Sequence, residues 1–332
     1  AGDHVVASPS LYGGTYNLFA HTLPQMGIEA RFADARKPET FAALIDKRTK
    51  AIFCESIGNP LGNVTDFAAL AKVAHAHGIP LIVDNTVPSP YLCRPFEHGA
   101  DIVVHSLTKY LGGHGTSVGG AIVDSGKFPW AEHKERFKRL NEPDVSYHGV
   151  VYTEALGPAA YIGRARVVPL RNMGACISPM NAFLILQGIE TLALRMDRIC
   201  DNTLAIAKHL QKHPKVAWVN YAGLPDHADH ALVKKYMNGK ASGILSFGLK
   251  HKDADPRAAG ARVLDAFKLF TRLVNIGDAK SLATHPASTT HRQLNPTELA
   301  KAGVSEDMVR LSVGIEHIDD LLADLEQALT AV

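Results

Sequence analysis

The stretch Asp101-Ile102-Val103-Val104-His105-Ser106-Leu107-Thr108-Lys109 is an apolar run that ends in hydroxyl side chains and an amine. An earlier run, Pro80-Leu81-Ile82-Val83, ends in Asp84 and Asn85. Before it, residues 66–78 place apolar side chains on one helical face, with Thr65 as the expected N-cap. Short β-branched runs that alternate with helices are typical of a mostly parallel sheet covered by helices. The sequence therefore predicts an α/β fold here.

The second half of the chain has a different pattern. A long helical stretch covers residues 181–212, with a break expected near Gly188. Beyond it, the strand-like run 243–249 and the helical run 319–329 predict a smaller α+β unit. A chain of 332 residues, 46% of them hydrophobic, is long enough for two cores. We therefore expect a large domain over residues 1–192 and a C-terminal small domain over 193–332.

Polar residues that directly follow apolar runs are the first candidates for a site. Ligands of open α/β sheets bind outside the carboxyl ends of the strands, which is where such residues lie. Three groups meet this condition: Asn59 after the run 50–54, Asp84 with Asn85, and Ser106 with Thr108 and Lys109. The sequence thus predicts a site at this edge of the sheet.

Lys109 and Asp84 suit a cofactor that reacts with an amine and carries a basic ring nitrogen. A lysine becomes a Schiff-base nucleophile when burial or a nearby cation lowers its pKa, and a carboxylate favours a protonated pyridine. Singly, such a lysine is more often a solvated surface residue, and such an aspartate more often caps a turn. Their joint appearance at successive strand ends favours pyridoxal 5'-phosphate (PLP), with the hydroxyls of Ser106 and Thr108 near its phosphate.

Composition argues against several classes of protein. The 35 Lys and Arg residues nearly balance 33 Asp and Glu residues and are spread along the chain, so we expect no nucleic-acid partner. No apolar stretch is long enough for a bilayer and no signal peptide is evident, so a cytoplasmic protein is expected. The four widely separated cysteines read as reduced thiols. The 17 histidines show no metal-ligand spacing, and no metal is predicted.

A different class of enzyme is suggested by Gly115-Thr116-Ser117-Val118-Gly119. This segment matches the G-x-S-x-G elbow of serine hydrolases, in which the serine sits between a strand and a helix. The residues after Ser117 read as a strand, at 119–123, so a loop serine is the favoured interpretation. A hydrolase that depends on Ser117 and not on Lys109 stays as an alternative.

Longer motifs resemble the Cys/Met-metabolism PLP enzymes over essentially the whole chain. The segments Val83–Thr86 and Arg94–Gly115 are similar to the cofactor segment of that family. The resemblance continues through four further motifs: Ser10–Thr15, Glu55–Pro60, His285–His291 and Arg310–Gly314. It implies PLP-dependent fold type I, the aspartate aminotransferase-like fold, with a mostly parallel sheet in the large domain.

The resemblance implies a cofactor role for each matching residue. Lys109 would carry PLP as a Schiff base and move a proton, and Asp84 would pair with the ring nitrogen. Ser106 and Thr108 would bind the phosphate. Asn59 would approach the ring hydroxyl and the substrate. PLP is thus the implied cofactor.

Other matching residues would act on the substrate. Tyr12 would stack on the cofactor ring and assist the departure of the leaving group, although a tyrosine in this position is otherwise commonly a core residue. Arg310 would hold the substrate carboxylate in a bidentate pair. Asn275 stands where γ-synthases and γ-lyases of the family usually have serine, so it would contribute to substrate choice.

Subgroup features resemble the O-acetylhomoserine sulfhydrylases, also called aminocarboxypropyltransferases. They are the segment Leu273–Leu282, the connection Phe128–Ala175, and Gly14, where methionine γ-lyases typically carry cysteine. The implied reaction is γ-replacement, in which O-acetyl-L-homoserine and sulfide, or a thiol, give L-homocysteine and acetate in methionine and cysteine biosynthesis. Cystathionine γ-synthase and methionine γ-lyase activities stay as alternatives because they use the same cofactor residues.

The resemblance also bears on assembly. It implies a homotetramer built from dimers that share active sites. Family members have roughly a hundred residues before the position of Ala1, less than a typical domain, with a phosphate loop and a Tyr-x-Arg pair that reaches a neighbouring subunit. The expectation is therefore a large domain without its N-terminal part, and an inactive or truncated subunit is a further alternative.

Overall fold

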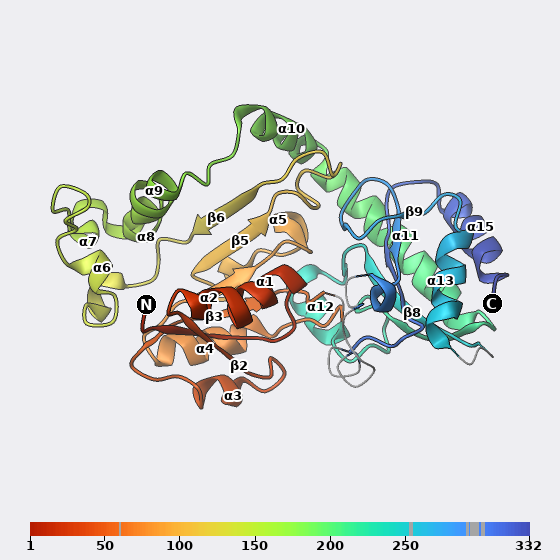
Figure 1. The fold of residues 1–332 in the computed structure, drawn as a ribbon, viewed down its shortest axis with the longest axis horizontal. Helices are drawn as coiled ribbons and strands as arrows, with labels where there is room; N and C mark the ends of the chain where they lie inside the picture. The colour runs from red at the N-terminus through yellow and green to blue at the C-terminus, as the bar shows by residue number, and fades with distance from the viewer. Residues whose placement is uncertain (60, 252–254, 290–291, 293–298, 300–302) are drawn as a thin grey trace.

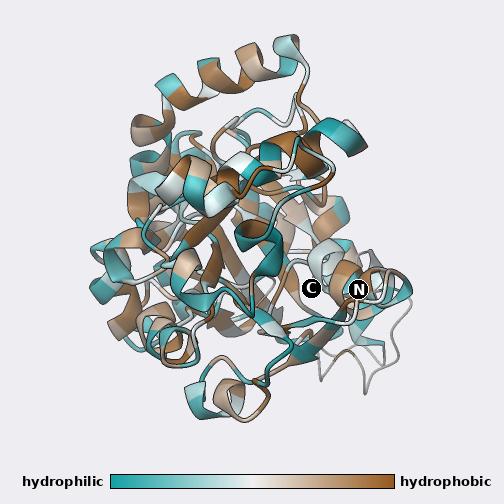
Figure 2. Ribbon diagram, turned by 90° about the vertical axis from the view of Figure 1, so that its left-hand side faces the viewer, coloured by the Kyte–Doolittle hydropathy of each residue, from teal (hydrophilic) through white to brown (hydrophobic). Residues whose placement is uncertain are grey.

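The computed structural model describes residues 1–332 except 60, 252–254, 290–291, 293–298 and 300–302. Of the motif residues quoted above, Pro60, Thr290 and His291 lie outside the described residues. The described part of the chain contains two β-sheets, each packed against helices (Figure 1). Figure 2 shows hydrophobic residues gathered on the central strands and hydrophilic residues on the outer turns.

The first sheet has strand order β2-β1-β3-β4-β5-β6. Its strands are β1 (His4–Ala7), β2 (Glu29–Phe32), β3 (Thr49–Glu55), β4 (Leu81–Asp84), β5 (Ile102–Ser106) and β6 (Gly120–Asp124). The pairs from β2 to β5 are parallel, and β6 pairs with β5 in the antiparallel direction. The carboxyl ends of β3, β4 and β5 therefore meet at one edge, as the sequence predicts.

The second sheet has strand order β7-β8-β11-β10-β9. Its strands are β7 (Val216–Asn220), β8 (Ile244–Leu249), β9 (Thr271–Arg272), β10 (Leu282–Thr284) and β11 (Val309–Ser312). All pairs are antiparallel except β9 with β10. This mixed α+β arrangement agrees with the pattern expected for the C-terminal part, while the boundary at residue 192 stays a prediction.

Helices surround both sheets. The longer ones are α4 (Phe67–Ala76), α10 (Pro179–Glu190), α11 (Leu192–Lys212), α12 (His230–Met237), α13 (Pro256–Ala266) and α15 (Ile318–Leu329). Short helices of the first part are α1 (Gly13–Asn17), η1 (Leu18–Thr22), α2 (Leu23–Gln25), α3 (Pro38–Ala42), α5 (Ser89–Leu92) and η2 (Pro95–His98). Further short helices are η3 (Trp130–His133), α6 (Lys138–Asn141), α7 (Tyr152–Leu156), η4 (Gly157–Ala159), α8 (Ala160–Ala165), η5 (Arg166–Leu170), α9 (Arg171–Met173) and η6 (Pro286–Ser288).

Two helix boundaries differ from the sequence prediction. The N-cap of α4 is Asp66, whose carboxylate accepts a hydrogen bond from the Ala69 amide, so the prediction of Thr65 was wrong by one residue. Thr65 instead donates its hydroxyl to the carbonyl of Glu55, 2.8 Å away. The long helix is interrupted at Thr191, between α10 and α11, and not at Gly188.

Gly188 serves close packing inside α10. A Cβ atom placed on Gly188 would lie 2.0 Å from the carbonyl oxygen of Gly112, in the loop that follows β5. The buried guanidinium of Arg195 holds the same loop, donating to the carbonyls of Tyr110 at 2.7 Å and of Gly188 at 2.6 Å. The glycine therefore lets α10 approach the loop that carries Lys109.

Replacing Gly188 with alanine is expected to destabilise the protein by about 1–3 kcal/mol, the usual cost of overpacking. Helix propensity alone would give the opposite sign, because alanine favours helices by about 1 kcal/mol over glycine. Urea unfolding measures the difference. Gly120→Ala is the matched control, since its Cβ would lie 3.7 Å from the His105 carbonyl oxygen, an ordinary contact. A Gly188→Ala variant as stable as the parent would contradict this packing.

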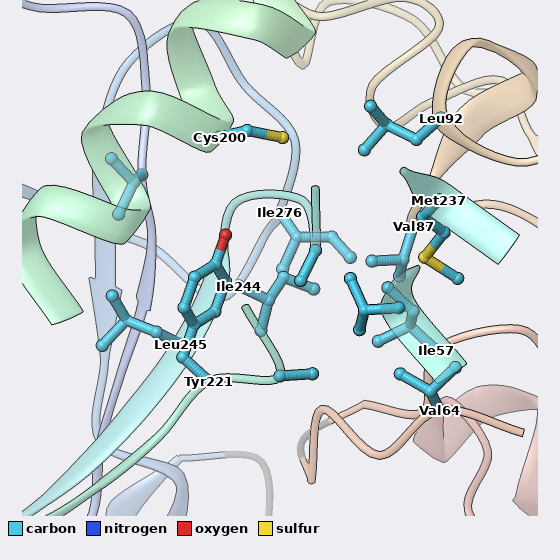
Figure 3. Packing of buried hydrophobic residues seen from close by; sticks show 14 of the residues in the cluster. Ile57, Val64, Val87, Leu92, Cys200, Tyr221, Met237, Ile244, Leu245 and Ile276 are labelled. Carbon is cyan, nitrogen blue, oxygen red and sulfur yellow. The ribbon is translucent and has the colours of Figure 1, made fainter. Parts of the chain in front are cut away.

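Buried side chains join the two sheets into one core. Ile57, Val64, Val87 and Leu92 come from loops and a short helix beside the first sheet, and they belong to the same buried cluster as residues of the second part. Figure 3 shows them facing a group from the second part, Cys200, Tyr221, Ile244, Leu245 and Ile276, while Met237, also from the second part, lies beside Val87. This packing sets the position of the second sheet relative to the edge where β3, β4 and β5 end.

Candidate active site

Lys109 lies in the turn directly after β5. Its amide donates to the carbonyl of Ser106 at 3.3 Å, and its own carbonyl accepts from the amide of Gly113 at 2.7 Å. The half-buried amine of Lys109 donates a hydrogen bond to the side-chain oxygen of Asn275, which lies in the second part of the chain. The turn thus directs the amine from the first sheet toward the second.

The surroundings of Lys109 favour its neutral form. Burial lowers the pKa of the Lys109 amine, and the positive charge of Arg310 lowers it further. Both effects follow from the cost of a charged amine in a poorly solvated position near another cation. A neutral amine is the nucleophilic form, so a lowered pKa is what a Schiff-base lysine requires, and the role of Lys109 stays a prediction.

Removing the charge of Arg310 is expected to raise the pKa of Lys109. In Arg310→Met, the amine would carry a smaller neutral fraction at any given pH, because the neutral form predominates above the pKa. NMR titration of ¹³C-methylated lysines in the ligand-free protein measures this, with Lys109→Ala assigning the signal. Titration of Lys109 at the same pH in both proteins would show that Arg310 does not act on it.

Arg310 is buried at the start of β11, 5% exposed. Its guanidinium donates to the side-chain oxygen of Asn59 at 3.1 Å and to the carbonyl of Val274 at 2.6 Å. Burial lowers the pKa of Arg310 to about 10, which leaves it a cation at neutral pH. Its Nε atom is buried and has no hydrogen-bond partner among the residues that the structure describes. A buried cation with an unused donor is suited to an anionic ligand.

Asp84 is the last residue of β4 and is half-buried. One carboxylate oxygen accepts from the amide of Thr86 at 2.9 Å, and the Thr86 hydroxyl accepts from the amide of Ser106 at 2.8 Å. Burial raises the pKa of Asp84, and among the described residues the groups that oppose this shift, the amide and hydroxyl of Thr86, include no cation. A cationic ligand would lower the pKa again.

The two hydroxyl residues line the turn between β5 and β6. The Thr108 hydroxyl donates to the carbonyl of Gly119 at 3.3 Å and accepts from the amide of Gly119 at 3.1 Å. Ser106 and Thr108 are both half-buried. Their place beside Lys109 is the one expected, whereas phosphate binding stays a prediction.

Tyr12 precedes α1 and is 54% exposed, so it is not the core aromatic that the alternative interpretation allows. A Cβ atom placed on Gly14 would lie 2.6 Å from a ring carbon of Tyr12, so the ring folds back over this glycine. The Tyr12 amide donates to the carboxylate of Glu55 at 2.6 Å. Glu55 and Asp84 are paired residues of β3 and β4, which places the backbone of Tyr12 near Asp84.

The structure brings Lys109, Asn275, Arg310 and Asn59 into one polar network that crosses between the two sheets. Asp84 is joined to the backbone of Ser106 through Thr86, at the same edge. Sequence reasoning assigned no role to Glu55 or Thr86. Glu55 follows an apolar run directly, so the rule that selected Asp84 could have found it, whereas Thr86 comes two residues after Asp84 and follows no apolar run.

The other candidate sites receive less support. Ser117 lies in an irregular segment before β6, without the helix that a nucleophile elbow needs, and its hydroxyl donates to the side-chain oxygen of Asn181 at 3.5 Å. Within the described residues, no group of three or more His, Cys, Asp or Glu side chains is placed to hold a metal ion. Among the same residues, no helix is both long and apolar enough to cross a bilayer.

A cavity of about 1050 Å³ lies away from this network. Its lining includes His4, Lys50 and Pro80, at the amino ends of the parallel strands. The lining also includes Trp130 and Tyr161, which stack with ring centroids 5.4 Å apart. Because ligands of such sheets bind at the carboxyl ends, this cavity is not the candidate active site.

Comparison with known proteins gives a family match over residues 1–330, to the family described as Cys/Met metabolism PLP-dependent enzyme. The chain is 52% identical over 330 residues to homocysteine synthase of Schizosaccharomyces pombe, covering 99% of this chain and 76% of that protein. It is 50% identical over 331 residues to O-acetyl-L-homoserine sulfhydrylase 1 of Thermus thermophilus, covering 99% of this chain and 77% of that protein.

Two solved structures have the same fold. A putative O-acetylhomoserine (thiol)-lyase of Campylobacter jejuni, which contains N'-pyridoxyl-lysine-5'-monophosphate, superposes with a TM-score of 0.93 at 43% identity. The match covers 99% of this chain and 77% of that one. Cystathionine gamma-lyase of Lactobacillus plantarum superposes with a TM-score of 0.80 at 33% identity, covering 100% of this chain and 77% of that one.

Proposed function

Because this chain belongs to the Cys/Met metabolism PLP-dependent enzyme family, we propose that it catalyses γ-replacement on O-acetyl-L-homoserine. Acetate leaves the γ-carbon and sulfide adds there, giving L-homocysteine. The observation that carries the proposal is the network of Lys109, Asn275, Arg310 and Asn59. The choice of substrate rests on the names of relatives that are about half identical in sequence, a homocysteine synthase and an O-acetyl-L-homoserine sulfhydrylase.

The residues present fit PLP. Lys109 is a half-buried amine with a lowered pKa, as a group that condenses with an aldehyde requires. Asp84 is a half-buried carboxylate with a raised pKa and no cation among the groups that stabilise its charge in the described part of the chain. A pyridinium nitrogen is such a cation. Ser106 and Thr108 place hydroxyl donors beside the lysine for a phosphate.

Bound at Lys109, PLP supplies an electron sink that makes the hydrogen on the substrate's α-carbon acidic. The carboxylate of Asp84 holds the ring nitrogen in its cationic form. With PLP bound, the Lys109 amine would take the α-proton of the substrate and move it along the substrate. Asn275 accepts a hydrogen bond from this amine in the ligand-free structure and so orients it.

Arg310 binds the substrate carboxylate in our proposal. Within the described part of the chain its Nε atom has no partner, and its Nη1 atom is hydrogen-bonded to the neutral side-chain oxygen of Asn59, which a carboxylate can replace. Asn59 then contacts the substrate and the ring hydroxyl. Tyr12 would hold the cofactor ring from one side, and its hydroxyl would donate a proton to the departing acetate.

Product analysis tests the proposed function. The purified protein is loaded with PLP and incubated with O-acetyl-L-homoserine and either sulfide or cysteine, and separately with methionine. Homocysteine and acetate from the sulfide reaction are the expected products. Cystathionine from cysteine, or methanethiol from methionine, as the main product would assign one of the related activities instead.

We also infer that the protein assembles as a homotetramer. Large hydrophobic side chains are exposed along α10, at the top of Figure 1: Met180, Phe183, Leu184, Leu186 and Ile189. An exposed apolar surface of this kind favours burial against another protein. Sedimentation of the parent and of Phe183→Asp is expected to show dissociation in the variant. A parent that sediments as a monomer would contradict the assembly.

The cytoplasm is the compartment that we propose. The four cysteines are free, and Cys54, Cys93 and Cys200 are buried. Free thiols agree with a reducing compartment. Fractionation of cells that produce the tagged protein provides the test, and recovery outside the cytosolic fraction would contradict the inference.

A further inference from the structure

Glu55 is a buried carboxylic acid beside the candidate active site, and the proposed function does not use it. It is the last residue of β3 and 5% exposed. Its side chain accepts a hydrogen bond from the Tyr12 amide at 2.6 Å. The register of β3 with β4 places it directly beside Asp84. Among the described residues, no ion pair to Glu55 is present to offset the cost of burying its charge.

This position favours the protonated acid. Burial raises the pKa of Glu55 well above its usual range, and the neighbouring charge of Asp84 raises it further. Two adjacent carboxylates share a site most easily when one of them keeps a proton. Asp84 has amide and hydroxyl donors from Thr86, so Asp84 is the better place for the charge. A protonated glutamic acid has the shape and the acceptor of glutamine.

Tyr12 depends on few other contacts. Its ring is exposed and lies over Gly14. Among the described residues the start of α1 has no side-chain cap, and the acid of Glu55 restrains the Tyr12 backbone by accepting from its amide. Loss of this acceptor would free the residue that, in the proposed function, stacks on the cofactor.

We propose that Glu55 is a positioning residue that fixes Tyr12 over the cofactor ring as a neutral hydrogen-bond acceptor, and leaves the negative charge of the site to Asp84. The proposal rests on the proposed function for the role of Tyr12. Glu55 itself touches neither substrate nor cofactor in this proposal.

The first test uses the ligand-free protein and three side chains at position 55. Glu55→Gln keeps the acceptor without the acid, whereas Glu55→Met keeps a similar volume without an acceptor. Hydrogen exchange at the Tyr12 amide is expected to be unchanged in Glu55→Gln and about tenfold faster in Glu55→Met, as for one lost hydrogen bond. Urea unfolding checks that both variants are folded, and Glu55→Ala replaces Glu55→Met if that variant is not.

The second test uses PLP binding, followed by absorbance. The dissociation constant of PLP is expected to rise about tenfold in Glu55→Met and to change less than about twofold in Glu55→Gln. In a Tyr12→Ala background, Glu55→Met is expected to have no further effect, because coupled residues are not additive. The kcat of Glu55→Gln is expected to stay near that of the parent, and the kcat of Glu55→Met is expected to be lower.

Three results would overturn the proposal. The first is an unchanged exchange rate of the Tyr12 amide in Glu55→Met. The second is a Glu55→Gln variant that binds PLP as weakly as Glu55→Met. The third is additivity of the Tyr12 and Glu55 substitutions in their effects on PLP binding. If the parent protein binds no PLP, the proposed function fails, but the exchange test still decides whether Glu55 holds Tyr12. The two failures are therefore distinguishable.

Discussion

Replacing Lys109 with alanine is expected to lower kcat for homocysteine formation by roughly 10⁴-fold or more, the upper range for losing a general acid–base group. The amine of Lys109 is held by the turn after β5 and contacts Asn275, and alanine has no group that can take its place. Steady-state assays with O-acetyl-L-homoserine and sulfide measure the loss. Unfolding by urea is expected to change little, since the amine is half-buried and makes few contacts.

Lys50→Ala is the matched control for this substitution. Lys50 is also half-buried, but it lies within β3, near the amino-terminal end of that strand. Its amine pairs with Asp3 at 3.5 Å, far along the strand from the candidate active site. Activity near that of the parent is expected. Equal losses in both variants would mean that Lys109 acts through the fold and not through chemistry.

The second large effect is expected for Asp84→Asn. Asparagine keeps the acceptor for the Thr86 amide, so the local turn survives while the charge is lost. Breaking a buried charge pair costs about 3–5 kcal/mol, which corresponds to a decrease in kcat of roughly 10²-fold to 4 × 10³-fold. The steady-state assay with O-acetyl-L-homoserine and sulfide measures this decrease. A kcat of Asp84→Asn within about threefold of the parent value would show that no cation depends on Asp84.

Asp124→Asn provides a closely matched control. Asp124 ends β6, its carboxylate accepts from the amide of Gly126 two residues on, and burial raises its pKa as it does for Asp84. Because β6 is antiparallel to β5, Asp124 lies at the opposite edge of the sheet. The control therefore reproduces the local chemistry of Asp84 without its position, and parental activity is expected.

Local pattern predicted the first sheet and one half of the site. The runs 80–83 and 101–105 form β4 and β5, and the polar residues after them lie at one edge. This works because buried strands are short and apolar, and because parallel strands end on the same side. The expected fold is confirmed by the match to solved PLP-family structures.

The other half of the site could not come from such patterns. Arg310 lies 251 residues from Asn59, and Asn275 lies 166 residues from Lys109. Their contacts depend on how the two sheets pack, which periodicity does not encode. The resemblance to a family supplied these residues, and their roles stay predictions.

Helix details show the same limit. Thr65 and Asp66 are both suitable N-cap residues by type. The Thr65 hydroxyl donates to the carbonyl of Glu55, so Asp66 caps α4. A glycine inside a helical pattern reads as a break, but Gly188 is explained by a loop far away in sequence. Glu55 also follows an apolar run, but its contact with the Tyr12 amide and its place beside Asp84 are set by the folded structure.

Identification of the residue that carries the cofactor tests the account most directly. The protein is loaded with PLP, reduced with borohydride and digested, and the modified peptide is sequenced by mass spectrometry. We expect loss of the absorbance band near the visible edge and a pyridoxyl group on Lys109 alone, with neither band nor label in Lys109→Ala. A label on another lysine, or a Lys109→Ala protein that retains the band, would contradict the account.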